Sequence, residues 1–126
     1  MRKKVIHTDK APSAIGTYSQ AIESNGMLFI SGQIPLEPNT MKIIEGDFEA
    51  RARQVFTNLQ AIAEAAGGEL NDAIKITVFL TDLKNFAKVN SVMEEFFVPP
   101  FAARAAVGVS SLPKDVDIEA DAILAV

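Results

Sequence analysis

Residues 101–126, at the end of this sequence, contain two segments in which apolar and polar side chains alternate. A period of two is typical of a β-strand that buries one face. One face of the first segment carries Phe101, Ala103, Ala105, Val107 and Val109. Arg104 is the only charged residue of its other face. The apolar face of the second segment carries Val116, Ile118, Ala120, Ala122 and Leu124, and its polar face carries Asp117, Glu119 and Asp121.

We expect the two segments to pair as an antiparallel hairpin with its turn at residues 110–115. This register places Arg104 near Asp121, and it places Glu119 opposite Ala106 and diagonal to the arginine. A guanidinium and a carboxylate would then share one surface beside a gap lined by alanines. A purely structural role is the alternative, because charged residues on strands often form ion pairs or a solvated face.

The composition limits the chemistry that the chain can perform. With 126 residues, 48% of them hydrophobic, we expect a single domain over residues 1–126. There is no cysteine and one histidine, His7, which we expect at the surface. The sequence therefore lacks the residues needed for a thiolate nucleophile or a zinc cluster, and it offers only His7 for a serine–histidine triad. No metal site is expected.

The net charge and the hydropathy of the sequence limit its expected binding partners and its expected location in the cell. The formal net charge of −4 disfavours nucleic acid as a partner. No stretch approaches the ~18 apolar residues of a membrane span, and the basic start is not followed by an apolar run. We expect a cytoplasmic protein without membrane contact, in weak agreement with its lack of cysteine.

Turn formers and periodicity locate the remaining strands. Residues 1–7 predict at best a weak edge strand. Asn25-Gly26 predicts a tight hairpin turn between strands over residues 17–24 and 27–31. Residues 73–80 alternate as a half-buried strand, and its apolar face carries Ile74, Ile76, Val78 and Leu80.

Two helices are expected between and after these strands. From Asp47 to Ala66, apolar residues recur at alternating steps of four and three, and Gly67-Gly68 follows as a stop signal. A second helix begins near Asn85 and ends before Pro99-Pro100. Its expected buried residues are Phe86, Val89, Met93, Phe96 and Phe97.

This order of elements predicts an α+β fold with one mixed β-sheet and two helices packed on one face. The other face would carry Phe29, Thr77, Phe79, Arg104, Glu119 and Ile123. That surface is too apolar to remain in water and too polar for an ordinary core. We expect identical subunits to cover it, with the charged groups in clefts between chains.

Four stretches of this sequence match a known family. They are A-P-S-A-I-G-T-Y-S-Q-A (11–21), F-I-S-G-Q-I-P (29–35), T-V-F-L-T-D-L-K-N-F-A-K-V-N (77–90) and L-P-K-D-V-D-I-E-A-D-A-I (112–123). In this order, with a single arginine before the last pair of strands, the chain resembles the RidA (YjgF) family of reactive-intermediate imine deaminases. The resemblance implies a chorismate-mutase-like α+β subunit and a homotrimer with three interfacial sites. It also implies hydrolysis of 2-imino acids to 2-oxo acids and ammonia without a cofactor.

The resemblance assigns roles to individual residues. Arg104 would hold the substrate carboxylate through a bidentate ion pair. Glu119 would position and polarise the attacking water. The other residues expected to line the pocket are Tyr18, Ser31, Gly32, Asn90 and Ala106, the last through its backbone N–H. Without the resemblance, Tyr18 would be a packing residue and Ser31-Gly32 a strand end, while Asn90 would be either a buried hydrogen-bonding residue or a pocket amide.

The chain departs from the family pattern at two places. Ala106 stands where many relatives have a cysteine, which removes thiol chemistry and keeps the backbone donor. Ala102 stands where a proline usually precedes the arginine by two residues, and segment 98–103 looks shorter than in typical members. Imine hydrolysis needs no covalent nucleophile, so we expect the chemistry to survive if Arg104 and Glu119 keep their relation. Substrate preference and rate are expected to differ from those of typical deaminases.

The leading hypothesis is an imine deaminase acting on 2-aminoacrylate-derived imines such as 2-iminopropanoate and 2-iminobutanoate. The alternative is a non-catalytic trimer that binds or senses a 2-oxo acid, or that interacts with another protein. Both need Arg104, but only the enzyme needs Glu119 as more than a structural acid. A third possibility, a ribonuclease or translation inhibitor, is disfavoured by the acidic charge and the single histidine.

Overall fold

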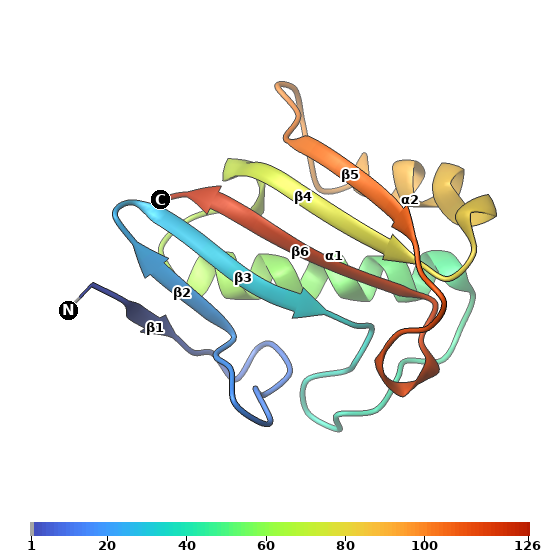
Figure 1. Cartoon of the computed structure of the whole chain (residues 1–126), viewed down its shortest axis with the longest axis horizontal. Coiled ribbons are helices and arrows are strands. Elements are labelled where there is room, and N and C mark those ends of the chain that lie inside the picture. Colours follow the sequence, from blue (N-terminus) through green and yellow to red (C-terminus); the bar gives the residue numbers. More distant parts are fainter. Residues whose placement is uncertain (1) are drawn as a thin grey trace.

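The structure, a computed structural model that describes residues 2–126, consists of one sheet and two α-helices (Figure 1). The strands are β1 (Lys4–Ile6), β2 (Ala21–Ser24), β3 (Met27–Gln33), β4 (Ala73–Leu80), β5 (Ala103–Gly108) and β6 (Ile118–Ala125). The helices are α1 (Phe48–Ala65) and α2 (Phe86–Met93). Met1, the first residue of the expected edge strand, lies outside the described residues. In the described part, no helix is long and apolar enough to cross a membrane.

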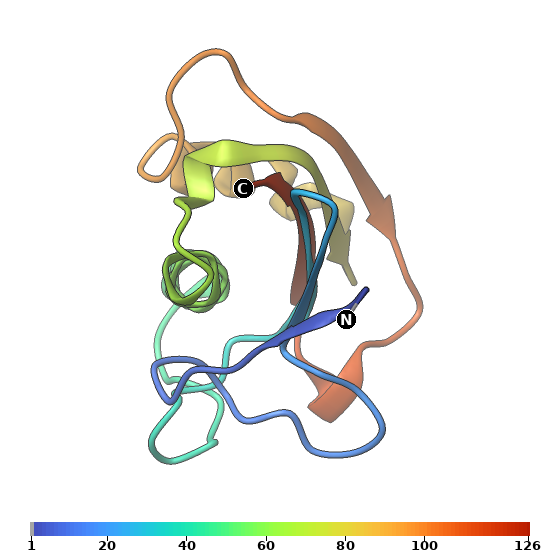
Figure 2. The ribbon, with the colours of Figure 1, turned by 90° about the vertical axis from the view of Figure 1, so that its left-hand side faces the viewer.

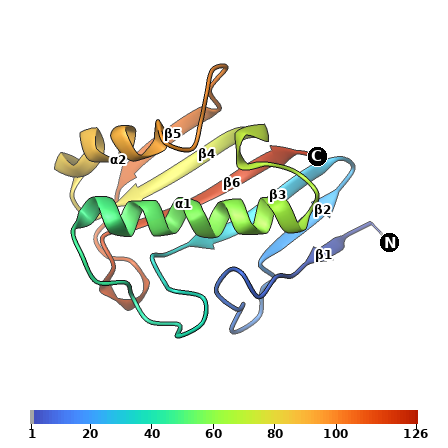
Figure 3. The same cartoon turned by 180° about the vertical axis from the view of Figure 1, so that it is seen from behind.

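The sheet has the strand order β1-β2-β3-β6-β4-β5. Only β4 and β5 run parallel, so the sheet is mixed. Figure 1 shows the sheet in front of both helices, and Figure 3 shows the helices from their own side. Viewed along α1, the helix layer and the sheet are separate (Figure 2). The predicted α+β fold, with both helices on one face of one mixed sheet, is confirmed.

The predicted turn at Asn25-Gly26 joins β2 to β3. Asn25 and Gly26 have φ values of 52° and 76°, the left-handed conformation that both central residues of a type I′ turn require. The preceding strand begins at Ala21, later than expected, and β3 continues to Gln33. Between Ile30 and Gln33 the register with β6 shifts, so Ser31 and Gly32 form a bulge.

Helix α1 has the predicted limits and the predicted buried face. The Asp47 side chain caps its start by accepting a hydrogen bond from the Ala50 N–H at 2.9 Å. After the helix, Gly67 has a φ of +83°, and the Gly68 N–H donates to the Ala63 carbonyl at 3.0 Å. The buried apolar residues of α1 are Phe48, Ala52, Val55, Phe56, Leu59, Ile62 and Ala63. They form the core together with the covered face of the sheet.

The predicted hairpin of the last two strands is wrong. Strand β4 lies between β5 and β6, parallel to the first and antiparallel to the second. The physical reason is the connection through α2, because a strand, a helix and a next strand usually form a crossover with parallel strands. Glu119 therefore lies opposite Phe79, and Asp121 lies opposite Thr77.

The expected face of Arg104 is also wrong. Its partner in the ladder is Ile76, which is fully buried under the helices, so Arg104 points to the helix side of β5. Phe29, Thr77, Phe79, Glu119 and Ile123 do occupy the other face, which we call the open face. Phe29 remains 46% exposed there.

Two apolar residues expected in the core are exposed. Ile74 is 44% exposed because the register of β4 shifts between Ala73 and Lys75, which brings Ala73 rather than Ile74 onto the covered face. Phe86 is 37% exposed, and its ring lies under the guanidinium of Arg104.

Candidate functional site

Arg104 and Glu119 line two different cavities. The first, of about 380 Å³, lies between α2, β4 and the segment before β5, and Asn90 and Arg104 contribute its polar groups with Glu94. The second, of about 480 Å³, lies where three loops meet beside the end of β3. Tyr18, Gly32 and Glu119 line it. We call them the Arg104 cavity and the Glu119 cavity.

Helix α2 positions Arg104 with three side chains from one of its faces. The Nη1 group donates a hydrogen bond to Oδ1 of Asn90 and lies 3.6 Å from Sδ of Met93. The Cζ atom lies 4.8 Å from the ring centroid of Phe86, a cation–π contact. The three helical residues are spaced by four and three, so they lie along one face of α2.

The rest of the guanidinium is available to a ligand. Within residues 2–126, Arg104 forms no ion pair, and its Nε and Nη2 have no acceptor. The alternative that Arg104 serves as a structural ion pair with Asp121 or Glu119 is therefore wrong within this chain. Nε and Nη2 form the pair of parallel donors that a carboxylate accepts in a bidentate contact.

Glu119 is half-buried on the open face, and the pKa of its carboxyl is raised. Burial, and then the charge of the nearby Asp121, raise the pKa of the Glu119 carboxyl. Among residues 2–126, no group donates a hydrogen bond to this carboxylate and no cation pairs with it. A carboxylate with a raised pKa and free oxygens is suited to take up a proton from a bound water.

Gly32 allows this carboxylate to lie against β3. A Cβ atom added at Gly32 would lie 2.0 Å from Oε2 of Glu119, which is a severe clash. Only a glycine permits so close an approach of side chain to backbone. The predicted pocket residue Gly32 is therefore adjacent to Glu119, as required for a shared site.

Of the two predicted hydroxyl residues, Tyr18 lines the Glu119 cavity and Ser31 does not. Tyr18 is 53% exposed, and its hydroxyl accepts a hydrogen bond from the Ile15 N–H at 3.4 Å, so its own proton is free to donate. The Ser31 hydroxyl instead donates to the Ser19 carbonyl at 2.6 Å. Ser31 thus ties β3 to the loop that carries Tyr18, and it is not among the residues that line the cavity.

A buried amide shapes the same loop. Gln20 is 2% exposed, and its Nε2 donates to the carbonyls of Thr8, Ala11 and Pro12. Its Oε1 accepts from the Thr8 N–H at 2.7 Å. One side chain therefore holds residues 8–12 in place, and Pro12 of this segment forms part of the cavity wall. Sequence reasoning did not single out Gln20.

The backbone of Ala106 is available at the edge of the sheet. The N–H of Val109 donates to the Leu80 carbonyl of β4 at 2.9 Å. Because backbone N–H groups alternate along a strand, the N–H of Ala106 points away from β4. Strand β5 is an edge strand, so among the described strands this donor has no partner.

The structure thus divides the predicted site residues into two groups within one chain. Arg104 and Asn90 lie together on the helix side, whereas Tyr18, Gly32 and Glu119 lie together at the other cavity. Asn90 proves to be a half-buried amide that contacts the arginine. The role of each as a catalytic or binding residue stays a prediction.

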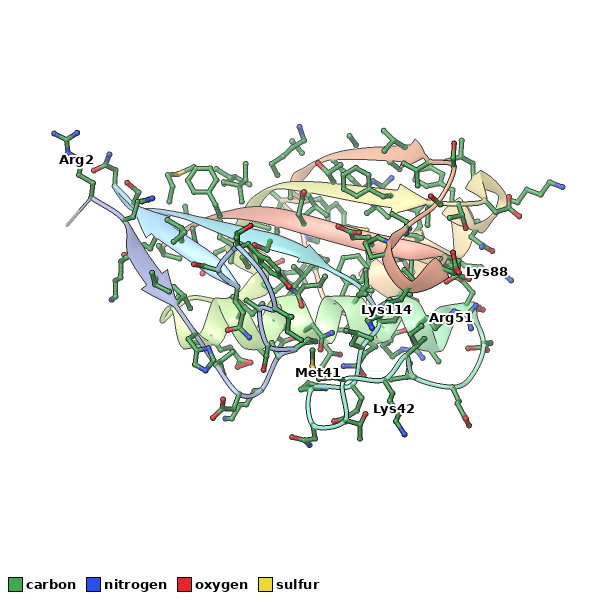
Figure 4. All side chains as sticks on the ribbon, turned by 60° about the horizontal axis from the view of Figure 1, so that its bottom comes forward. Arg2, Met41, Lys42, Arg51, Lys88 and Lys114 are labelled. Atoms are coloured by element: carbon green, nitrogen blue, oxygen red, sulfur yellow. The ribbon has the colours of Figure 1, made fainter. Side chains whose placement is uncertain are left out.

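Several residues in or beside the two cavities were not anticipated there from the sequence. Phe86 and Met93 support Arg104, and their spacing around Asn90 is the signal that could have identified them. Met41 and Lys114 line the Glu119 cavity from two loops, which Figure 4 shows on the same side of the molecule. Lys114 and Asp115 have φ values of 55° and 57°, a conformation that few residues other than glycine adopt. In the described chain, no group of three or more His, Asp or Glu side chains is placed to hold a metal ion.

Comparisons with known proteins give consistent similarities. The family model described as Endoribonuclease L-PSP matches residues 8–126. A RutC family protein of Pyrococcus horikoshii is 54% identical over 121 residues, 96% of each chain. The 2-iminobutanoate/2-iminopropanoate deaminase of Salmonella typhimurium is 48% identical over 123 residues, 95% of each chain. The crystal structure of RidA from an Antarctic Psychrobacter has 50% identity and a TM-score of 0.94, and the match covers 98% of this chain and 99% of that one.

Proposed function

Because this chain belongs to the RidA (YjgF) family, which also includes the RutC proteins, we propose that it is an imine deaminase. The proposed substrates are 2-imino acids such as 2-iminopropanoate and 2-iminobutanoate. Water adds across the C=N bond, the C–N bond then breaks, and the products are a 2-oxo acid and ammonia. The name of the Salmonella relative supports this reaction. We also propose that residues 1–126 act as one cytoplasmic domain.

The opposite orientations of Arg104 and Glu119 carry the proposal and suggest that the site lies between subunits. Within one chain, Arg104 and Glu119 point to opposite faces of the sheet, and neither has an oppositely charged partner among residues 2–126. We propose a homotrimer in which the open face of each subunit is covered, and in which Arg104 of one subunit meets Glu119 of the next. Half-exposed Phe29 and Val107 on the open face are consistent with such burial. A head-to-tail interface that closes after three subunits creates three equal sites.

In the proposed mechanism, Nε and Nη2 of Arg104 hold the carboxylate of the imine. This contact converts a bimolecular reaction into a positioned one. Glu119 accepts a proton from the attacking water and passes it to the imine nitrogen, which gives a tetrahedral adduct with a hydroxyl and an amino group. The proton of this hydroxyl group is then transferred through Glu119 to the nitrogen, as the C=O bond forms, the C–N bond breaks and ammonia leaves. General acid–base help of this kind is worth about 100- to 10,000-fold. The Tyr18 hydroxyl and the N–H of Ala106 remain as donors to the carboxylate or the adduct.

The first test measures ammonia and 2-oxo acid from imines that an amino-acid oxidase generates in situ. Wild type should accelerate their release, and Arg104→Ala and Glu119→Gln should lose most of the acceleration. The mass by light scattering should be near three times 13.6 kDa. A folded wild-type trimer without acceleration would instead favour the non-catalytic module that binds a 2-oxo acid.

A second test asks whether neighbouring subunits share the site. Arg104→Ala and Glu119→Gln chains are mixed in equal amounts, unfolded and refolded together. In a head-to-tail trimer, about one quarter of the sites then receive an intact arginine and an intact glutamate. Activity should return to about a quarter of the wild-type value. If the mixture stays as inactive as its components, both residues act within one subunit or the pairing is wrong.

RNA cleavage, which the name of the family model suggests, has little support in this chain. The net charge is −4, and a nucleic-acid surface is normally basic. His7 is exposed beside Asp9 and lines neither cavity. RNA cleavage by highly purified protein that disappears in Glu119→Gln would overturn this conclusion.

A further inference from the structure

The Arg104 cavity has an interior that the proposed reaction does not use. Its walls beyond the arginine are mainly apolar and come from four parts of the chain. They comprise Ile76 of β4, Met93 of α2, Phe97 after this helix, and Phe101 and Ala102 before β5. Its volume of about 380 Å³ lies within the range of small-molecule sites. A methyl or ethyl side chain would leave most of it empty.

The charges around this cavity restrict what can enter. The guanidinium of Arg104 lines one part of the wall, and its Nε and Nη2 have no acceptor among residues 2–126. Glu94 lines another part and would repel a second anionic group. The matching ligand therefore has one carboxylate and, a few bonds away, an apolar group.

The wall at Ala102 leaves room for that group. Ala102 is half-buried and packs against the core, so its small side chain helps to set the depth of the cavity. Phe101, next to it, is 64% exposed and forms part of the rim. Met93 contributes a flexible thioether, a side chain that adapts to ligands of different shape.

We propose that the Arg104 cavity receives the side chain of the substrate, and that the preferred imines are those of large apolar amino acids such as leucine, methionine and phenylalanine. This inference rests on the proposed imine deaminase function. It assigns the same carboxylate contact to Arg104 and adds a side-chain subsite on the helix side of the sheet. Acidic side chains are excluded by Glu94.

The test compares imines derived from leucine and alanine in wild type, Ala102→Leu and Ala87→Leu. Ala87 is an exposed residue of α2 that does not line the cavity, so its variant is the matched control. Wild type should have the higher kcat/KM for the leucine-derived imine. Ala102→Leu narrows the cavity and should lower that value by about 10- to 200-fold, the range for pocket misfits of this size. In Ala102→Leu the value for the alanine-derived imine should fall less than that for the leucine-derived imine, and in Ala87→Leu neither value should change by more than about twofold.

Binding of the product acids separates this inference from the proposed function. Calorimetry with 4-methyl-2-oxopentanoate and pyruvate needs no turnover. Wild type should bind the larger acid more tightly, and Ala102→Leu, or the milder Ala102→Val if the first does not fold, should lose this advantage. If wild type hydrolyses imines but both acids bind equally, the subsite is wrong and the deaminase remains. If wild type hydrolyses neither imine but prefers the larger acid, the subsite remains and the deaminase is wrong.

Discussion

Replacing Gly32 by alanine should displace the Glu119 carboxylate and leave the fold intact. The new Cβ would lie 2.0 Å from Oε2, and an ordinary contact begins near 3.4 Å. The carboxylate must therefore retreat by about 1.4 Å. Gly32 does not have a positive φ, so alanine can adopt the same backbone conformation. The clash is with the end of a flexible side chain, which can rotate away at little cost to the core.

The cost to the reaction follows from the size of this displacement. A misplacement of about 1 Å at a reacting centre can lower the rate by about 100-fold, which corresponds to about 2.7 kcal/mol in the activation free energy. We expect kcat/KM for 2-iminopropanoate to fall by about this factor in Gly32→Ala. Thermal unfolding should stay within a few degrees of wild type. Gly68→Ala, at a glycine that lines neither cavity and has no positive φ, should retain full activity.

Combining Gly32→Ala with Glu119→Gln tests whether the first substitution acts through the carboxylate. If Gly32→Ala acts only through the carboxylate, adding it to Glu119→Gln should cause little further loss, because the two changes remove the same function. Losses that simply multiply would show that Gly32 contributes in another way. If a folded Gly32→Ala protein kept the wild-type kcat/KM, the proposed position of the Glu119 carboxylate in the reaction would be refuted.

Three further substitutions test the electrostatics and the supports of the site. Asp121→Asn removes a charge that raises the pKa of Glu119, so that pKa should fall and the acidic limb of the kcat/KM profile should move to lower pH. Gln20→Ala leaves several buried backbone groups without partners, and we expect a loss of about 1–3 kcal/mol in the free energy of unfolding and faster proteolysis within residues 8–12. Arg51→Ala breaks the contact with Asp117 at 2.7 and 3.0 Å, which should cost about 1 kcal/mol in urea unfolding.

Each of these predictions has a clear contrary result. An acidic limb that stays in place or moves to higher pH in Asp121→Asn would mean that Glu119 does not control it. Unchanged proteolysis in Gln20→Ala would show that another contact holds the loop. Arg53→Ala removes a more exposed ion pair, with Glu95, and serves as the control for Arg51→Ala. Equal losses in the two arginine variants would contradict the ranking by burial.

Local signals predicted the elements of this fold accurately. The steps of four and three between apolar residues and the glycine pair that follows located α1 almost to the residue. Asn25-Gly26 located the first hairpin, because this dipeptide readily adopts two left-handed residues in succession. Alternation located β4 and β6 and correctly placed Glu119 and Asp121 on the open face.

Neighbour relations were harder to predict, because alternation shows the two faces of a strand but not its partner. Segment 103–108 alternates in the same way whether β4 or β6 lies beside it. The helix between β4 and β5 was the better guide, since such a connection favours parallel strands. The side of Arg104 depends on burial that the sequence does not reveal, although Phe86, Asn90 and Met93 on one face of α2 indicate a partner for a cation.

The central position of β6 has a consequence for synthesis of the protein. Strands β1 to β3 and strands β4 and β5 form the two sides of the sheet, and only β6 joins them. Since β6 follows all other strands in the chain, a growing polypeptide holds two unjoined sheet edges until this strand leaves the ribosome. Exposed edges of this kind favour aggregation and binding to chaperones. The sheet therefore becomes continuous only after β6 has been synthesised.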